Sequence, residues 1–133
     1  MVVERVRDGR RIAQLFAGEI RGHTRDPLAR LSIVDVEDVE GCSGGAFAFG
    51  IDETAVARTD GSARSARLAD VYVHETQARV VLSDGLDRAE PVARELGLDA
   101  ERRGADPPEL RLLLADGVDA KRALGVFSAV AAR

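Results

Sequence analysis

The first predicted element is a helix near the N-terminus. Apolar residues recur at positions i, i+3, i+4 and i+8 from Ile12 to Ile20, which is the spacing of one helix face. Asp8 stands where an N-cap side chain accepts free backbone amides, and Gly22 stands where a helix stops. We therefore expect a helix over residues 8–21.

Two strands are predicted next, separated by a turn at Gly41–Gly45. Leu28–Glu40 has a β-branched centre and an acidic end, and Ala46–Ile51 alternates large and small residues. The large residues of the second strand are Phe47, Phe49 and Ile51. A weaker segment, Thr54–Arg58, is interpreted as one arm of a hairpin with its tip at Asp60-Gly61-Ser62.

Residues 67–83 have the pattern of a second β-hairpin. A two-residue turn at Thr76-Gln77 makes the facing residues on one side apolar, namely Val73 with Val80 and Val71 with Leu82. This side is the expected core face.

The opposite side of that hairpin carries the candidate binding residues Asp70, Tyr72, His74 and Arg79. In this register His74 lies directly opposite Arg79. Tyr and His combine an apolar ring with a polar tip, which suits a binding surface. Ordinary cross-strand pairing on a solvated face and, less favoured, catalysis remain open as alternatives.

A short helix and two strands are predicted in the next part of the chain. Pro91 is tolerated only in the first helical turn, so we expect the N-cap of this helix near Asp87 and its end at Gly97. Leu98–Arg103 is interpreted as a short edge strand and Glu109–Ala115 as a further strand.

The chain is expected to close with a helix that opens at Asp116. The strand-to-helix junction there, residues 112–119, resembles the earlier junction at residues 80–87, since both contain Asp-Gly, an aliphatic residue and Asp. Turn and cap chemistry explains both junctions. The alternative is that the junctions lie side by side and bring four carboxylates together as a cation site.

These elements predict a single α+β domain over residues 1–133, with one mostly antiparallel sheet and helices on one of its faces. The expected order is α-β-β-β-α-β-β-α, give or take the strand pieces at 54–58 and 98–103. By analogy of element order alone, the chain resembles type III secretion chaperones and YbjN-like domains.

Composition narrows the functional classes. The chain has 133 residues, 45% of them hydrophobic, and a net charge of −4 from 19 basic and 23 acidic residues. This balance disfavours a dedicated nucleic-acid protein, which usually carries a basic excess. The chain has neither a run of roughly 20 apolar residues for a membrane helix nor the pattern of a signal peptide. We therefore expect a cytoplasmic protein with no membrane contact. One cysteine and two histidines indicate no disulfide, metal site or cofactor.

Catalytic motifs are weak. Gly41–Gly45 matches G-x-S-x-G with Ser43 at the nucleophile position, but a strand follows it, and the motif needs a helix there. Cys42 is a lone thiol with no base at a defined spacing. Two charged groups are interpreted as solvated surface, the carboxylates between Asp35 and Glu53 and the arginines between Arg5 and Arg11.

Three segments carry a family resemblance: Asp8–Glu19, Leu28–Asp38 and Ala69–Val73. In this order they resemble a group of small haloarchaeal proteins of unknown function, with residues 53–65 in the place of an insertion. The resemblance implies a haloarchaeal host and a cytoplasmic location, and it carries no site residues.

The predicted function is a non-catalytic protein-interaction or adaptor domain, expected to form a homodimer and to bind an unknown protein. The alternative is a nucleic-acid-associated regulator that uses arginine contacts. A small hydrolase-like enzyme comes third.

Overall fold

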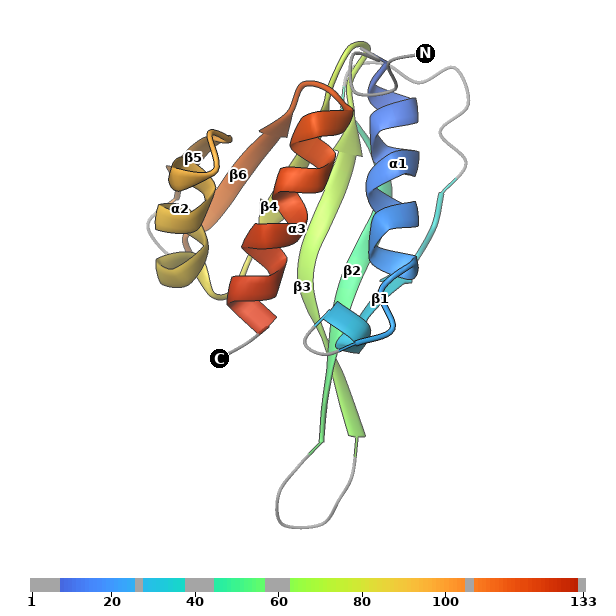
Figure 1. The fold of residues 1–133 in the computed structure, drawn as a ribbon, viewed down its shortest axis with the longest axis vertical. Coiled ribbons are helices and arrows are strands. Elements are labelled where there is room, and N and C mark those ends of the chain that lie inside the picture. The colour runs from blue at the N-terminus through green and yellow to red at the C-terminus, as the bar shows by residue number, and fades with distance from the viewer. Residues whose placement is uncertain (1–7, 26–27, 38–44, 57–62, 105–106, 132–133) are drawn as a thin grey trace.

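The helices of the described chain lie on one face of a six-stranded antiparallel sheet (Figure 1). The computed structural model describes residues 8–25, 28–37, 45–56, 63–104 and 107–131. Within them the element order is α-β-β-β-β-α-β-β-α, so four strands precede the middle helix. The predicted α+β class, single sheet and one-sided helical layer are confirmed.

The first helix, α1 (Gly9–Arg21), forms as its sequence predicts. The Asp8 carboxylate accepts hydrogen bonds from the backbone amides of Arg10 and Arg11, and Gly22 follows the last turn. Ile12, Phe16 and Ile20 are buried, as are Ala13 and Ala17, so the apolar stripe faces the sheet.

The strands are β1 (Leu31–Val34), β2 (Ala46–Val56), β3 (Ala63–Val73), β4 (Ala78–Leu82), β5 (Asp99–Arg103) and β6 (Glu109–Leu114). They lie in the order β1-β2-β3-β4-β6-β5, and every neighbouring pair is antiparallel.

β1 and β5 form the two edges of the sheet. β1 is shorter than its predicted strand, because residues Leu28–Arg30 form a 3₁₀ turn and Asp35 has a φ of 52°. β5 confirms the predicted edge strand, and four of its five residues are charged. The expected end of the first strand, 38–40, lies outside the described residues, as do most of the turn at 41–45 and the hairpin tip at 60–62.

The β3–β4 hairpin has the predicted faces but not the predicted register. Val73 is opposite Ala78 and Tyr72 is opposite Arg79, so the turn lies at Glu75-Thr76. The predicted pairing of His74 with Arg79 is therefore wrong by two residues. A slip of two residues keeps every side chain on its own face, so the hydrophobic pattern is equally good in both registers.

β2 departs from simple alternation at a bulge. Phe47 is opposite Tyr72 and Phe49 is opposite Val71, which leaves Ala48 as the extra residue. Phe49 and Ile51 consequently face the core, whereas Phe47 faces the other side with Tyr72.

The middle helix, α2 (Leu86–Glu95), starts earlier than predicted. Its N-cap is Gly85, whose φ of 70° lies in the left-handed region that glycine readily adopts. The expected N-cap near Asp87 is therefore wrong, and Pro91 lies within the helix and not in its first turn.

The last helix, α3 (Gly117–Ala131), has a side-chain cap of its own. The Asp116 carboxylate accepts from the Asp119 amide, and the Asp119 carboxylate accepts from the Ala115 amide. Because β4 and β6 are antiparallel, the two Asp-Gly junctions lie at opposite ends of these strands. The shared cation site considered for them is therefore wrong.

The helices and the inner face of the sheet enclose one hydrophobic core. Phe16 of α1 and Phe127 of α3 meet within it, with ring centroids 5.6 Å apart. None of the described helices is long and apolar enough to cross a membrane. The fold leaves the opposite face of the sheet without a helical layer, and that face carries the candidate residues.

Candidate functional site

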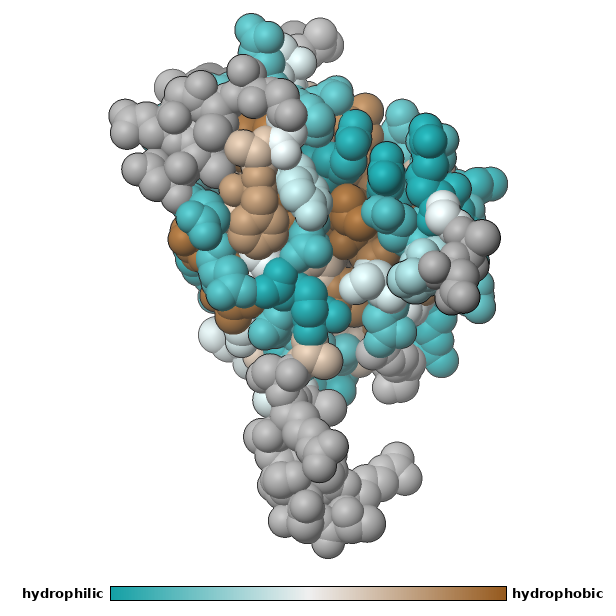
Figure 2. Space-filling view, turned by 180° about the vertical axis from the view of Figure 1, so that it is seen from behind, coloured by the Kyte–Doolittle hydropathy of each residue, from teal (hydrophilic) through white to brown (hydrophobic). Residues whose placement is uncertain are grey.

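The candidate site is the sheet face that no described helix covers, called the outer face below (Figure 2). Apolar side chains come to the surface there between polar ones. Antiparallel partners share a face, so the register places the predicted set together on it. That set is Asp70, Tyr72, His74 and Arg79.

Tyr72 lies near the middle of the outer face, on β3. Its ring packs edge-on against Phe47 of β2, with centroids 5.8 Å apart and planes at 71°. Burial raises the pKa of the Tyr72 phenol, and the negative charges of Asp70 and Glu109 raise it further. The phenol therefore stays neutral and keeps its proton for donation. Sequence reasoning missed Phe47, because the bulge at Ala48 moves it to this face.

His74 follows the end of β3 and closes the hairpin. Its backbone amide donates to the Gln77 carbonyl over 2.9 Å, and its ring packs over Gly45, where an added Cβ would lie 3.1 Å from Cε1. Nε2 is buried and has no hydrogen-bond partner among the described residues. Burial lowers the pKa of this imidazole, and the nearby Arg79 charge lowers it further.

Asp70 belongs to a cluster of three carboxylates around Arg67. The Arg67 Nε donates to Asp52 over 2.9 Å, and the two terminal nitrogens of the guanidinium pair with Asp70 and Asp35. The guanidinium lies over Gly50, since an added Cβ there would come within 2.4 Å of Cζ. The Asp70 hydrogen bond, with support from Asp52, raises the pKa of Arg67 although burial opposes it. We call these four residues the Arg67 cluster.

No local sequence pattern indicates the Arg67 cluster. Its acidic members are 3, 15 and 32 residues away from Arg67 along the chain, and three strands bring them together. Asp35 and Asp52 belong to the carboxylates that the sequence predicts as a solvated strand end. Both pair with the Arg67 guanidinium, where Asp35 keeps an exposed side chain and Asp52 is partly buried.

Arg79 lies on β4, opposite Tyr72, and is partly buried. Its side chain makes no ion pair or hydrogen bond with any residue that the structure describes. Two hollows of about 240 and 370 Å³ flank it, and Arg79 and Arg111 line both of them. Tyr72 and His74 line the larger hollow, whereas Gln77 and Arg103 line the smaller one.

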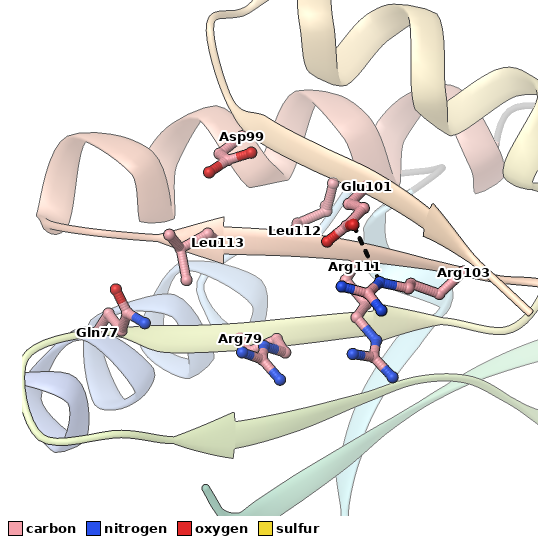
Figure 3. Close-up of a pocket in the computed structure, with 8 residues that line it drawn as sticks. All are labelled: Gln77, Arg79, Asp99, Glu101, Arg103, Arg111, Leu112 and Leu113. Atoms are coloured by element: carbon pink, nitrogen blue, oxygen red, sulfur yellow. Dashed lines mark ion pairs between the residues drawn. The ribbon is translucent and has the colours of Figure 1, made fainter. Parts of the chain in front are cut away.

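The arginines beside Arg79 are better compensated. Arg103 pairs with Glu101 over 3.0 Å, and Arg111 approaches Glu109 at 3.5 Å. Figure 3 shows the guanidinium groups of Arg79, Arg103 and Arg111 projecting from three neighbouring strands into one region. Of these three arginines, Arg79 forms no ion pair with a described carboxylate.

Ser43 and Cys42 lie outside the described residues, so the structure does not place the G-x-S-x-G motif. Within the described ranges, no group of three or more His, Cys, Asp or Glu side chains is arranged to hold a metal ion. The described geometry offers surface hollows, an aromatic pair and charges of both signs.

Comparison with protein families shows the family of the chain. The family of unknown function DUF7993 matches it over residues 1–133. The chain belongs to DUF7993. No curated protein and no solved structure matches this DUF7993 member, so the likeness to secretion chaperones stays an analogy of element order. The haloarchaeal host likewise stays a prediction.

Proposed function

We propose that this DUF7993 protein is a non-catalytic protein-interaction domain that binds through the outer face, and that its partner there is a second copy of the chain. The observation that carries the proposal is the Tyr72–Arg79 pair. These two residues lie side by side on the uncovered face, both partly buried, and Arg79 has no described ion-pair partner.

The residue types suit an interface between proteins. Tyr and Arg are enriched among the residues that dominate binding energy, because each combines a large contact area with directed hydrogen bonds. Val81 and Leu113, partly buried on neighbouring strands, extend the apolar surface around the pair. A partner that covers them removes apolar area from water, worth about 25 cal/mol per Å² before the costs of association.

The charges favour a protein partner over a nucleic acid. Among the described residues of the outer face, carboxylates outnumber arginines: Asp35, Asp52, Asp70, Asp99, Glu101 and Glu109 accompany Arg67, Arg79, Arg103 and Arg111. A polyphosphate backbone would meet this acidic excess along its path, whereas protein surfaces carry both signs.

Sedimentation velocity over a range of concentrations tests the proposal. We expect a dimer for the wild-type chain, and a dissociation constant at least about tenfold higher for Tyr72→Ala and for Arg79→Ala, equivalent to about 1.4 kcal/mol. Arg94→Ala is the matched control, because Arg94 lies on α2, exposed and paired with Glu90. Thermal melts establish that each variant is folded.

Three results would contradict the proposal. A wild-type monomer at every concentration refutes the dimer, and unchanged association of both outer-face variants refutes the surface. Binding of a labelled single-stranded oligonucleotide that weakens steeply with salt would replace protein binding by the nucleic-acid alternative.

A further inference from the structure

Two parts of the outer face carry charge that no other described residue compensates. In the Arg67 cluster, three carboxylates surround one guanidinium, so two negative charges remain in excess. On β4, the Arg79 guanidinium lacks any described ion-pair partner. An excess of acid and an unmatched base therefore lie on the same exposed face.

The chain does not join these two groups itself, although they are neighbours. Asp70 lies two residues before Tyr72 on β3, and Tyr72 is opposite Arg79, so Asp70 and Arg79 are diagonal partners on one face. Long side chains can reach across such a diagonal. The Asp70 carboxylate instead binds Arg67, and Arg79 turns towards the two hollows.

We propose that the outer faces of two copies pack together so that Arg79 of each copy binds the carboxylates of the Arg67 cluster of the other. This inference rests on the proposed function and adds the arrangement of the interface. In a twofold dimer a contact between two different residues occurs twice. The same pairing of Arg79 with the Arg67 cluster therefore compensates the charges of both copies. Tyr72 adjoins both Asp70 and Arg79 on this face, so the two contacts would enclose its ring, where water is excluded and ion pairs gain strength.

The charges of a twofold interface permit a swap experiment. In a homodimer of Arg79→Glu, the new glutamate of each copy faces the carboxylates of the other copy's Arg67 cluster. In a homodimer of Asp70→Arg, the new arginine of each copy faces Arg79 of the other copy. We expect each variant alone to dimerise about 100-fold more weakly than the wild type, a loss in the range found for interfacial charge pairs. In an equimolar mixture both contacts are again acid with base, so a heterodimer should form with affinity close to that of the wild type.

Two additional variants keep this test interpretable. The arginine introduced by Asp70→Arg would also face Arg67 of its own chain. Asp35→Lys therefore serves as a second variant that adds a base to the Arg67 cluster, at a more exposed member. Arg94→Glu on α2 introduces the same charge change away from the outer face and should leave the dimer unchanged. Differently labelled chains, followed by sedimentation, separate heterodimers from homodimers.

The outcomes distinguish this arrangement from the broader proposal. If Tyr72→Ala weakens the dimer but no mixture of charge variants restores it, the outer face binds a second copy in another arrangement and the inference is overturned. An undiminished Arg79→Glu homodimer also overturns it. A wild-type monomer at every concentration defeats both proposals together.

Discussion

The substitution Gly9→Ala probes the contact between the start of α1 and the β3–β4 turn. The Gly9 amide donates to the Glu75 carbonyl over 3.1 Å, so backbone meets backbone directly. An added Cβ would lie 1.9 Å from the carbonyl oxygen of His74 and 2.3 Å from that of Gln77, whereas real Cβ contacts essentially never fall below 3.0 Å. Neither oxygen can rotate away, because both belong to the main chain.

The expected cost follows from these contacts. Forcing extra atoms into a packed site costs about 1–3 kcal/mol, and loss of the Gly9 hydrogen bond costs about 1 kcal/mol more. The better helix propensity of alanine returns at most about 1 kcal/mol. We therefore expect the free energy of unfolding to fall by about 1–3 kcal/mol, and Tm to fall by about 4 °C for each kcal/mol in a chain of this size.

The assay is urea unfolding, with Gly18→Ala as the matched control. Gly18 lies in the same helix, and apart from its chain neighbours and the nearby helix backbone, no described atom lies within 4 Å of an added Cβ there. That substitution should stabilise the protein by about 0.5–1 kcal/mol, because it removes backbone freedom from the unfolded chain. A Gly9→Ala protein as stable as the wild type, or equal destabilisation by both substitutions, would refute the steric argument.

Three other predictions concern stability. Pro91→Ala should raise the free energy of unfolding by about 1–2 kcal/mol, because alanine restores the amide that donates to the Asp87 carbonyl; a loss of stability in urea would contradict this. Burial and the Arg79 charge lower the pKa of His74 in the folded protein. As pH falls through about 6.5, this histidine therefore becomes protonated in the unfolded chain before it does in the folded one, and the free energy of unfolding should fall over that range. His74→Gln should flatten this part of the pH profile, and an unchanged slope would show that other groups cause it. Phe127→Ala, which empties a fully buried position, should cost about 3–5 kcal/mol in the same assay, and a cost below that of a surface substitution would place the core elsewhere.

The sequence predicted which face each hairpin residue occupies, but not its partner. The face of each residue depends on whether apolar residues occupy the odd or the even positions of a strand. The alternating positions of Val71 and Val73, and of Val80 and Leu82, specify this clearly. The register depends on the turn, and the β3–β4 turn packs against Gly9, more than sixty residues earlier in the chain. Local pattern contains no information about that contact.

The candidate site was predictable only where one hairpin supplied it. Asp70, Tyr72, His74 and Arg79 lie on the predicted face because the argument from alternating positions holds. Phe47 reached the site through a bulge that alternation does not reveal, and Arg67 gained its importance from carboxylates on other strands. Both depend on tertiary pairing, which a single sequence does not display.

The edges of the sheet have a consequence for the size of any assembly. Free edge strands invite other chains to add to a sheet, and the resulting growth has no natural end. β5 presents charged side chains at four of five positions, and β1 ends after four residues, where Asp35 leaves the extended conformation. Neither edge is a good template for a further strand. We therefore expect the chain to tolerate high concentrations without forming fibrils, and we expect the proposed face-to-face pair to add no further copy through its sheet edges.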